Sequence, residues 1–198
     1  MDDGKLAGRR ASIRVATEAD AAGIRRVKAP YVERTAFNFA YEPPTVAEIA
    51  ADIRATLARH PFLVATLPEH GDPTAPRIVG FAQAEPYRVR DADRWNVELT
   101  IYLDADVRGH GIGRVLYGEL LRLLAAQNVR NAYACVTAEN AASVAFHRAL
   151  GFTEVGRFPS TGYKLGAWHD TVYLWKPLGE AGALPERFVP FPELARRM

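Results

Sequence analysis

Arg108-Gly109-His110-Gly111-Ile112-Gly113 is the stretch that decides the fold, because of the segments on either side of it. The segment before it, 97–103, alternates apolar and polar residues with the period of a β-strand. The segment after it, 112–127, repeats apolar residues at the spacing of a helix. The glycines therefore occupy the turn from a strand into a helix.

A glycine-rich turn in this position is suited to binding phosphate groups. Glycine has no Cβ atom to hold a ligand away from the backbone. The first N–H groups of a helix lack partners within the helix and carry partial positive charge, so they attract anions. Arg108 adds a full positive charge beside them. The predicted pyrophosphate-binding residues are Arg108, Gly109, His110, Gly111, Ile112, Gly113 and Arg114.

The same glycines are also compatible with a simple tight turn or with a dinucleotide-binding loop. Their spacing does not match Gly-x-Gly-x-x-Gly. No acidic residue about 20 positions further on closes a parallel strand–helix–strand unit. The sequence therefore favours a phosphate-binding turn that is not of the dinucleotide-binding class.

The composition is typical of a globular enzyme. The 198 residues are 48% hydrophobic and 24% charged, and the formal net charge of +2 is too small to indicate a nucleic-acid or membrane partner. The single cysteine excludes an internal disulfide and fits a reducing compartment. The start of the chain is polar, and no apolar run approaches the ~20 residues of a membrane span. We therefore expect a cytoplasmic protein.

Periodicity and turn residues predict a single α/β domain. Capping boxes at 17–20 and 45–48 begin two helices, and Pro30 is expected to end or bend the first. The predicted helices cover 17–30, 45–57, 112–127 and 141–150. The predicted strands cover 12–16, 62–67, 78–85, 96–103, 131–136, 152–158 and 170–176. A turn-rich loop is expected at 68–76, and a glycine-rich hairpin between the last two strands.

The predicted domain, 12–178, has a segment of different character on each side. Residues 1–11 read as a flexible N-terminal segment. Residues 179–198 are rich in proline and carry Phe188 and Phe191. We expect this C-terminal tail to pack on the domain rather than to form one of its own.

The glycine turn and its surroundings resemble the GNAT superfamily of N-acetyltransferases. That superfamily's acetyl-CoA motif is Arg or Gln, two residues, Gly, one residue, then Gly or Ala, between a strand and a long helix, and 108–113 fits it. A second superfamily element appears downstream as Asn140, Ala142-Ser143 and Gly151-Phe152. The resemblance implies a mixed, mostly antiparallel central sheet flanked by helices, with a splayed strand pair that admits acetyl-CoA.

Within the superfamily, the chain resembles the phosphinothricin N-acetyltransferase group over about residues 12–178. The matching motifs are Ile13–Asp20, Tyr31–Thr35 with Asn38-Phe39, Val97-Glu98 before Ile101–Leu103, and Gly162-Tyr163-Lys164-Leu165-Gly166-Ala167-Trp168-His169-Asp170. The resemblance implies transfer of an acetyl group from acetyl-CoA to the α-amino group of a small amino acid or analogue. Phosphinothricin, methionine sulfoximine and methionine sulfone are the expected types of acceptor, and a homodimer is the implied assembly.

Two other functions remain open at this point. One is an acetyltransferase for a different amine, such as a peptide N-terminus or a polyamine. The other is a non-catalytic module that binds acetyl-CoA. The histidines and acidic residues show no metal-ligand spacing, so no metal is expected.

Two residues are candidates for catalysis. Glu98 lies on the polar face of the strand that leads into the glycine turn, and it falls where the family's proposed general base lies. A carboxylate there can take the proton of the acceptor's ammonium group, although a structural or substrate-orienting role is the alternative. Many superfamily members carry a tyrosine acid where this chain has His147, whereas phosphinothricin-type enzymes carry histidine. His147 is predicted to act in catalysis or to contact the coenzyme, with a packed core histidine as the alternative.

The remaining candidates are binding residues. In the family, the strand at 96–103 pairs its backbone with the pantetheine arm, which implies coenzyme contacts at Ile101, Tyr102 and Leu103. Asn140 is either a helix N-cap or a coenzyme ligand. The resemblance implies acceptor contacts at Phe39, Arg88, Arg90 and Lys164, the arginines meeting acidic groups of the acceptor unless they form only a solvated loop. Asp93 departs from the aromatic residue expected in a phosphinothricin-selective enzyme.

Overall fold

The computed structural model of this chain describes residues 11–69, 72–180 and 184–198. The predicted N-terminal segment lies outside the described residues except for Ala11. The strands are β1 (Ser12–Val15), β2 (Phe62–Glu69), β3 (Asp72–Pro86), β4 (Asn96–Leu103), β5 (Asn131–Thr137), β6 (Thr153–Lys164) and β7 (Ala167–Pro177). The α-helices are α1 (Ala21–Arg34), α2 (Val46–Leu57), α3 (Ile112–Ala126), α4 (Ala141–Ala149) and α5 (Phe191–Ala195).

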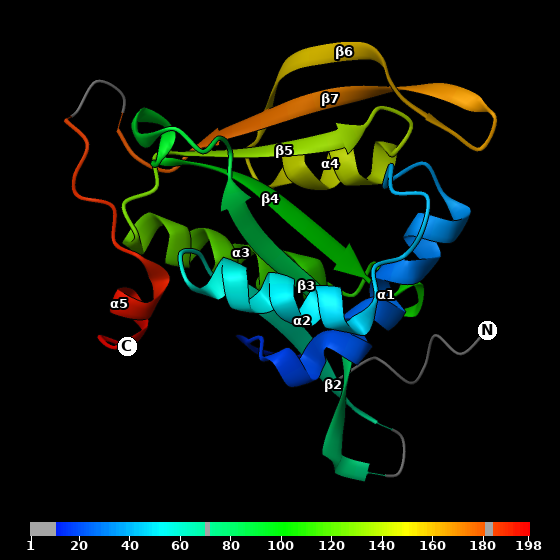
Figure 1. Cartoon of the computed structure of the whole chain (residues 1–198), viewed down its shortest axis with the longest axis horizontal. Helices are drawn as coiled ribbons and strands as arrows, with labels where there is room; N and C mark the ends of the chain where they lie inside the picture. Colours follow the sequence, from blue (N-terminus) through cyan, green and yellow to red (C-terminus); the bar gives the residue numbers. More distant parts are fainter. Residues whose placement is uncertain (1–10, 70–71, 181–183) are drawn as a thin grey trace.

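The strands form one seven-stranded sheet in the order β1-β2-β3-β4-β5-β7-β6 (Figure 1). Every neighbouring pair is antiparallel except β4 and β5, which run parallel. Alternating side chains point to opposite faces of a strand, so each strand contributes to two layers. The predicted fold class, a mixed and mostly antiparallel sheet flanked by helices, is confirmed.

Two hydrophobic layers cover the two faces of the sheet. On one face, Ile24 of α1 and Ile53 of α2 pack with Phe62 and Val64 of β2. On the other face, the buried residues of α3 pack against the alternate residues of β2, β3 and β4. Buried apolar area of this extent is the main driving force for folding.

Local sequence signals explain where the first helices begin. Thr45 accepts a hydrogen bond from Glu48 N–H, and the Glu48 carboxylate accepts one from Thr45 N–H, which completes the predicted capping box at the start of α2. The Thr17–Asp20 box instead begins a short 3-10 turn that leads into α1. Pro30 does not end α1, which continues past it to Arg34. Buried side chains on both sides of the proline, Val27 and Val32, hold the helix against the sheet.

Two predicted loops are strand instead. In the predicted loop at 68–76, residues 68–69 belong to β2 and 72–76 to β3, Pro68 pairs with Pro76, and residues 70–71 lie outside the described residues. The predicted hairpin segment before residue 170 is also strand, because β6 and β7 pair as far as Lys164 and Ala167. The chain reverses there over Leu165 and Gly166, both with positive φ, which suits a two-residue hairpin turn.

The parallel pair β4 and β5 separates partway along its length. The ladder joins only Asn96 with Asn131, Val97 with Ala132, and Glu98 with Tyr133. Beyond Glu98 the two strands diverge, as Figure 1 shows toward its right-hand side. β4 meanwhile remains paired with β3 from Val97 to Leu103. The splayed strand pair expected from the resemblance is therefore present.

The described part of the C-terminal tail lies against the end of α3. Phe188 and Phe191 are buried in the same hydrophobic cluster as α3. Val189 N–H donates to the Gln127 carbonyl, and the Gln127 side-chain amide donates to the Val189 carbonyl. These contacts position α5 at the end of the molecule opposite to the splay.

Candidate functional site

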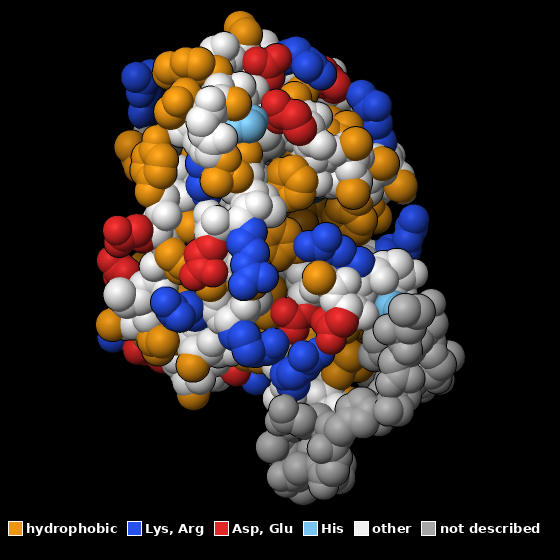
Figure 2. Space-filling model, turned by 90° about the vertical axis from the view of Figure 1, so that its right-hand side faces the viewer, with side chains coloured by type: hydrophobic (Ala, Val, Ile, Leu, Met, Phe, Trp, Pro, Cys, Tyr) orange, Lys and Arg blue, Asp and Glu red, His pale blue; other side chains and the backbone are white. Residues whose placement is uncertain are grey.

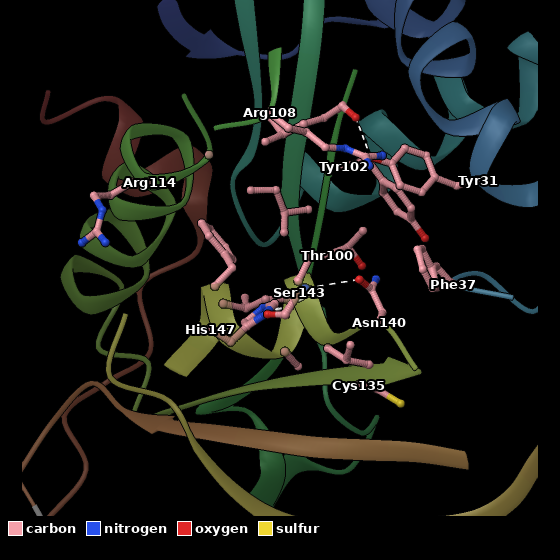
Figure 3. A pocket seen from close by; sticks show the side chains of 18 of the residues that line it. Tyr31, Phe37, Thr100, Tyr102, Arg108, Arg114, Cys135, Asn140, Ser143 and His147 are labelled. Carbon is pink, nitrogen blue, oxygen red and sulfur yellow. Dashed lines mark hydrogen bonds between the residues drawn. The ribbon is translucent and has the colours of Figure 1, made fainter. Parts of the chain in front are cut away.

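A cavity of about 420 Å³ fills the space between the diverging strands. Its walls come from β4, β5, the glycine turn, the start of α3 and α4 (Figure 3). Ten of the predicted residues line it: Ile101, Tyr102, Leu103, Arg108, Gly109, Gly111, Gly113, Arg114, Asn140 and His147. Figure 2 looks at the side toward which the strands diverge and shows a hollow lined by hydrophobic side chains, with Lys and Arg side chains beside it.

The glycine turn has the backbone that phosphate binding requires. Gly109 and Gly111 have φ of 81° and 79°, a region that residues with a side chain rarely adopt. A Cβ added at either one would meet no atom within 4 Å, so the constraint is conformational rather than steric. Gly111 is the N-cap of α3, which points the first N–H groups of that helix toward the cavity end.

Arg108 is held in place by an aromatic side chain from α1. Its guanidinium donates to the Tyr31 hydroxyl at 2.6 Å and lies 5.1 Å from the Tyr31 ring centroid. The Tyr31 hydroxyl in turn donates to the Leu103 carbonyl at 2.5 Å. The charge beside the glycine turn is therefore positioned by α1, a contribution that the motif alone does not reveal.

Three predicted phosphate-site residues make a weaker contribution to the cavity. The Ile112 side chain is buried in the hydrophobic core, and neither it nor His110 lines the cavity. Arg114 does line it, although Figure 3 shows its guanidinium directed away from the other labelled side chains. The backbone of the turn, rather than these side chains, faces the cavity.

Asn140 is the N-cap of α4, as one of its two predicted roles requires, and its predicted coenzyme contact stays a prediction. Its side-chain oxygen accepts a hydrogen bond from Ser143 N–H at 3.2 Å, which caps α4. The same side chain lines the cavity, and Figure 3 shows it near Ser143 and Thr100. The cap uses one lone pair of the amide oxygen, so capping and contact with a ligand are compatible.

His147 lines the cavity but is 2% exposed, and both ring nitrogens have partners inside the protein. Nδ1 lies 2.8 Å from the Ser143 carbonyl, which can only accept, so Nδ1 carries a proton. Nε2 lies 3.0 Å from the Tyr117 hydroxyl. Burial lowers the pKa of His147, partly offset by the bond to Ser143, and the ring is therefore neutral with its Nε2 accepting from Tyr117.

Glu98 is the residue at which β4 and β5 separate. It is half-buried, with Tyr133 beside it on β5 and Glu85 opposite it on β3. Burial and the charge of Glu85 raise the pKa of Glu98. Its charge in turn contributes to the raised pKa values of Cys135 and Tyr173, so it lies within electrostatic range of both.

A second cavity, of about 590 Å³, adjoins the first. Cys135 lines both cavities, so the two share a wall on β5. The second cavity contains two of the predicted acceptor residues, Phe39 and Arg88. The rest of its lining is Tyr87, Tyr133, Cys135, Val155, Gly156, Phe158, Thr161, Thr171 and Tyr173.

Two other predicted acceptor residues are not in this cavity. Arg90 is exposed at the start of a 3-10 turn and lines neither cavity. Lys164 is buried, and its ammonium group donates to the carbonyls of Val32, Asn38 and Ala40. Burial lowers the pKa of Lys164. Neither cation lines either cavity in this structure, so the acceptor contacts implied for Arg90 and Lys164 stay predictions.

Several lining residues were not predicted. Phe37 joins the first cavity, and the stacked pair Tyr87 and Tyr133, with ring centroids 4.6 Å apart, joins the second. Cys135 lines both cavities, and burial raises the pKa of its thiol. Thr100 had a signal in the sequence, because it shares the polar face of β4 with Glu98, and Tyr31, Ala142 and Ser143 belong to the motifs of the resemblance.

Two further observations bear on the kind of site. Among the described residues, no three His, Cys, Asp or Glu side chains gather in a way that would hold a metal ion. None of the helices described is both long enough and apolar enough to span a bilayer.

Comparison with known families identifies one match that covers most of the chain. The sequence profile of the acetyltransferase (GNAT) domain matches residues 13–173. This range includes β1 through most of β7, and with them both cavities.

Individual relatives agree with the family match. A phosphinothricin N-acetyltransferase from Streptomyces viridochromogenes is 35% identical over 92% of this chain and 95% of its own. An L-methionine sulfoximine/L-methionine sulfone acetyltransferase from Pseudomonas aeruginosa is 32% identical over 88% of this chain and 99% of its own. The crystal structure of a phosphinothricin acetyltransferase from Sinorhizobium meliloti in complex with AcCoA superposes with a TM-score of 0.83, at 34% identity, over 91% of this chain and 96% of that one.

Proposed function

This chain belongs to the GNAT acetyltransferases, and on that basis we propose that it transfers an acetyl group from acetyl-CoA to the α-amino group of a small amino acid or analogue. The observation that carries the proposal is the pair of adjoining cavities at the point where β4 and β5 separate. One cavity has a phosphate-binding turn at its end, and the other has an arginine among aromatic rings. The carboxylate of Glu98 lies where the strands part.

The first cavity suits acetyl-CoA. Beyond Glu98, β4 has no ladder with β5, so its edge can pair with the amide groups of a pantetheine arm at Ile101 and Leu103. The turn at Gly109 and Gly111 and the start of α3 suit a pyrophosphate, with Arg108 beside them. When bound, acetyl-CoA supplies an activated acetyl thioester. Asn140 and Tyr102 belong to the same proposed set of coenzyme contacts.

Glu98 is proposed as the general base. An α-ammonium group has no lone pair, so it must lose a proton before it can attack a carbonyl carbon. The raised pKa of Glu98, caused by burial and by Glu85, brings this carboxylate closer to the pKa of an amine and makes it a better proton acceptor. A positioned base of this kind contributes about 10²–10⁴-fold to the rate.

His147 is proposed as part of the wall of the coenzyme cavity rather than as a proton donor. Its Nδ1 proton is directed at the Ser143 carbonyl, and its Nε2 faces Tyr117. Neither arrangement points a proton into the cavity. Delivery of a proton to the departing thiolate is therefore assigned to solvent.

The second cavity supports an acceptor with one carboxylate and an uncharged side chain. Arg88 is the one charged side chain among its described lining residues, and it suits a carboxylate. Tyr87, Tyr133 and Phe158 offer ring surfaces to the remainder of the acceptor. Methionine sulfone and methionine sulfoximine fit this arrangement better than phosphinothricin, whose second anion would need a second cation. The described lining residues of this cavity include no carboxylate that could bind the positive charges of a polyamine.

A thiol-release assay over a panel of acceptors tests this function. We expect turnover with methionine sulfone and methionine sulfoximine, weaker turnover with phosphinothricin, and none with spermidine or a peptide N-terminus. A preference for spermidine or a peptide would assign a different amine. Binding of acetyl-CoA in a calorimeter without thiol release from any acceptor would indicate a non-catalytic module.

Assembly and location are part of the same proposal. Exposed apolar side chains gather on the β6–β7 hairpin, where Val155, Phe158, Leu165 and Trp168 are 50–64% exposed. A surface of this kind suits a homodimer. Light scattering of Trp168→Glu, expected to shift the mass from dimer to monomer, tests the assembly. The single cysteine fits a cytoplasmic enzyme.

A further inference from the structure

Lys164 is a buried lysine, and burying its charged ammonium group away from water costs free energy. Its side chain is 4% exposed at the end of β6. Its ammonium group donates to three backbone carbonyls, those of Val32, Asn38 and Ala40, at 2.6 Å each. An ammonium has three N–H groups, so all of them are used. Such complete hydrogen bonding offsets the cost of burying the charge.

The three carbonyls belong to one short stretch of chain. Val32 is in the last turn of α1, where carbonyls lack partners within the helix and the helix carries partial negative charge. Asn38 and Ala40 belong to the loop that follows, which we define as residues 35–41. The Lys164 ammonium therefore links the end of α1 to this loop, and the loop backbone surrounds the ammonium group.

The 35–41 loop forms part of both cavities. Phe37 lines the coenzyme cavity, and Phe39 lines the acceptor cavity. Thr137 of β5 anchors the first half of the loop by donating to the Ala36 carbonyl at 2.8 Å. Lys164 anchors the second half, because its partners Asn38 and Ala40 are the two neighbours of Phe39.

The hairpin around Lys164 is shaped to receive Phe39. A Cβ placed on Gly162 would lie 2.4–2.5 Å from three carbons of the Phe39 ring, so the ring seats directly on the glycine. The Nε2 atom of His169 lies 2.9 Å from the carbonyl oxygen of Lys164. The Gly162–Asp170 motif thus contacts the loop in two ways, through Gly162 under the Phe39 ring and through the Lys164 ammonium, and His169 supports Lys164.

We propose that Lys164 is a positioning residue for the acceptor: it fixes Phe39 in the acceptor cavity by holding the backbone on both sides of it. This inference rests on the proposed function of that cavity. Loss of the clamp loosens the backbone on both sides of Phe39, although Asn38 still donates to the Tyr102 hydroxyl and Tyr41 to the Tyr163 carbonyl. The Thr137 bond and the glycine turn stay intact. The effect therefore falls on acceptor binding more than on coenzyme binding or the chemical step.

The main test compares Lys164→Met with Lys176→Met, which removes a lysine from β7 of the same hairpin outside both cavities. For Lys164→Met we expect the KM of the acceptor to rise by about tenfold or more, since misplacing a binding group by about 1 Å is costly. We expect the affinity for acetyl-CoA, measured by calorimetry, to stay the same. An unchanged acceptor KM, or an equal rise in both variants, would overturn the proposal.

A second measurement reads the loop without using activity. Arg34 is exposed at the end of α1, immediately before the loop, so trypsin cleavage after it reports loop opening. We expect Lys164→Met to speed this cleavage several-fold and Lys176→Met to leave it unchanged. Equal rates would contradict the clamp. This readout separates the two proposals, because a wild-type protein without any turnover would overturn the function and still report on the loop.

Lys164→Gln guards against loss of folding in the methionine variant. Its amide keeps two N–H donors on a shorter side chain, so we expect an acceptor KM between those of the wild type and Lys164→Met. Folding of each variant is checked by near-UV circular dichroism. If both variants are unfolded, Lys164 serves the whole fold rather than the acceptor cavity, and the proposal is wrong.

Discussion

The two cavities differ in how the chain builds them. The coenzyme cavity takes half of its lining from one continuous strand–turn–helix unit, β4 to the start of α3, and the rest from β5, α4, α1 and the loop after α1. The acceptor cavity takes side chains from segments as far apart as Phe39, Arg88, Tyr133 and Tyr173. The first has the backbone of the glycine turn and a held arginine at one end, whereas the second presents aromatic rings and one exposed arginine. Backbone geometry suits a constant ligand such as a phosphate, and side chains suit a variable one.

Glu98 lies where β4 and β5 separate and lines neither cavity, and its replacement should have the largest effect. Glu98→Gln removes the proton acceptor, so we expect kcat to fall by about 10²–10³-fold at neutral pH. Raising the pH should restore part of the rate, because more of the acceptor amine is then uncharged. Steady-state rates from neutral pH upward measure both. A kcat close to that of the wild type would remove Glu98 from this role.

Glu85→Gln is the matched control for Glu98→Gln. The charge of Glu85 helps to raise the pKa of Glu98, so its removal should lower that pKa and shift the acid limb of the rate profile to lower pH. Because the pKa of Glu98 is raised in the folded state, the free energy of unfolding falls as the pH rises through that pKa and Glu98 ionises. Glu98→Gln should therefore not lower the Tm at neutral pH, and a large drop would assign the lost activity to misfolding.

The coenzyme cavity should respond to a change in backbone freedom. Gly111→Ala places a side chain at φ 79°, which costs about 1–2 kcal/mol and should raise the KM of acetyl-CoA by about 5- to 30-fold. The KM of the acceptor should change little. Gly118→Ala, the same substitution at an exposed position inside α3 with open space around it, should leave both constants unchanged. Equal behaviour of the two variants would contradict a conformational role for Gly111.

The acceptor cavity should respond to a change in charge instead. Arg88→Gln removes the arginine that lines this cavity, and we expect the KM of the acceptor to rise about tenfold, the value of one charge-assisted hydrogen bond. The KM of acetyl-CoA should not change. Arg90→Gln, two residues away and outside the cavity, is the control, and an equal effect from it would point to general electrostatics rather than to a contact.

The pair Tyr117 and His147 should have the smallest effect on turnover. Tyr117→Phe leaves the buried Nε2 of His147 without its hydrogen bond, which costs about 1–3 kcal/mol of stability and lowers the Tm. If His147 is a wall of the cavity, kcat should change by less than about threefold, since a proton-transfer role is worth far more. A fall of kcat by two orders of magnitude would instead make this pair the route of the proton.

The same difference between the cavities explains what could be predicted. The coenzyme turn is local in sequence, so its strand, glycines and helix appear together at 96–127 and were placed correctly. The sequence does not decide in the same way which of Arg88, Arg90 and Lys164 faces a ligand, because that depends on proximity in space. The resemblance implies an acceptor contact at Lys164, and only the carbonyls of α1 and the 35–41 loop, more than 120 residues away in the sequence, explain its burial.

By itself, the sequence determined the order of the secondary-structure elements, the glycine turn between β4 and α3, and the family, because these depend on neighbouring residues and their spacing. The tertiary structure alone decided which side chains meet at the acceptor cavity, that His147 is sealed by Tyr117 and Ser143, and that Lys164 holds a loop. These outcomes depend on long-range packing, which sets burial and hydrogen-bond partners. A residue's type specifies what chemistry it can perform, but the groups around it determine what it does.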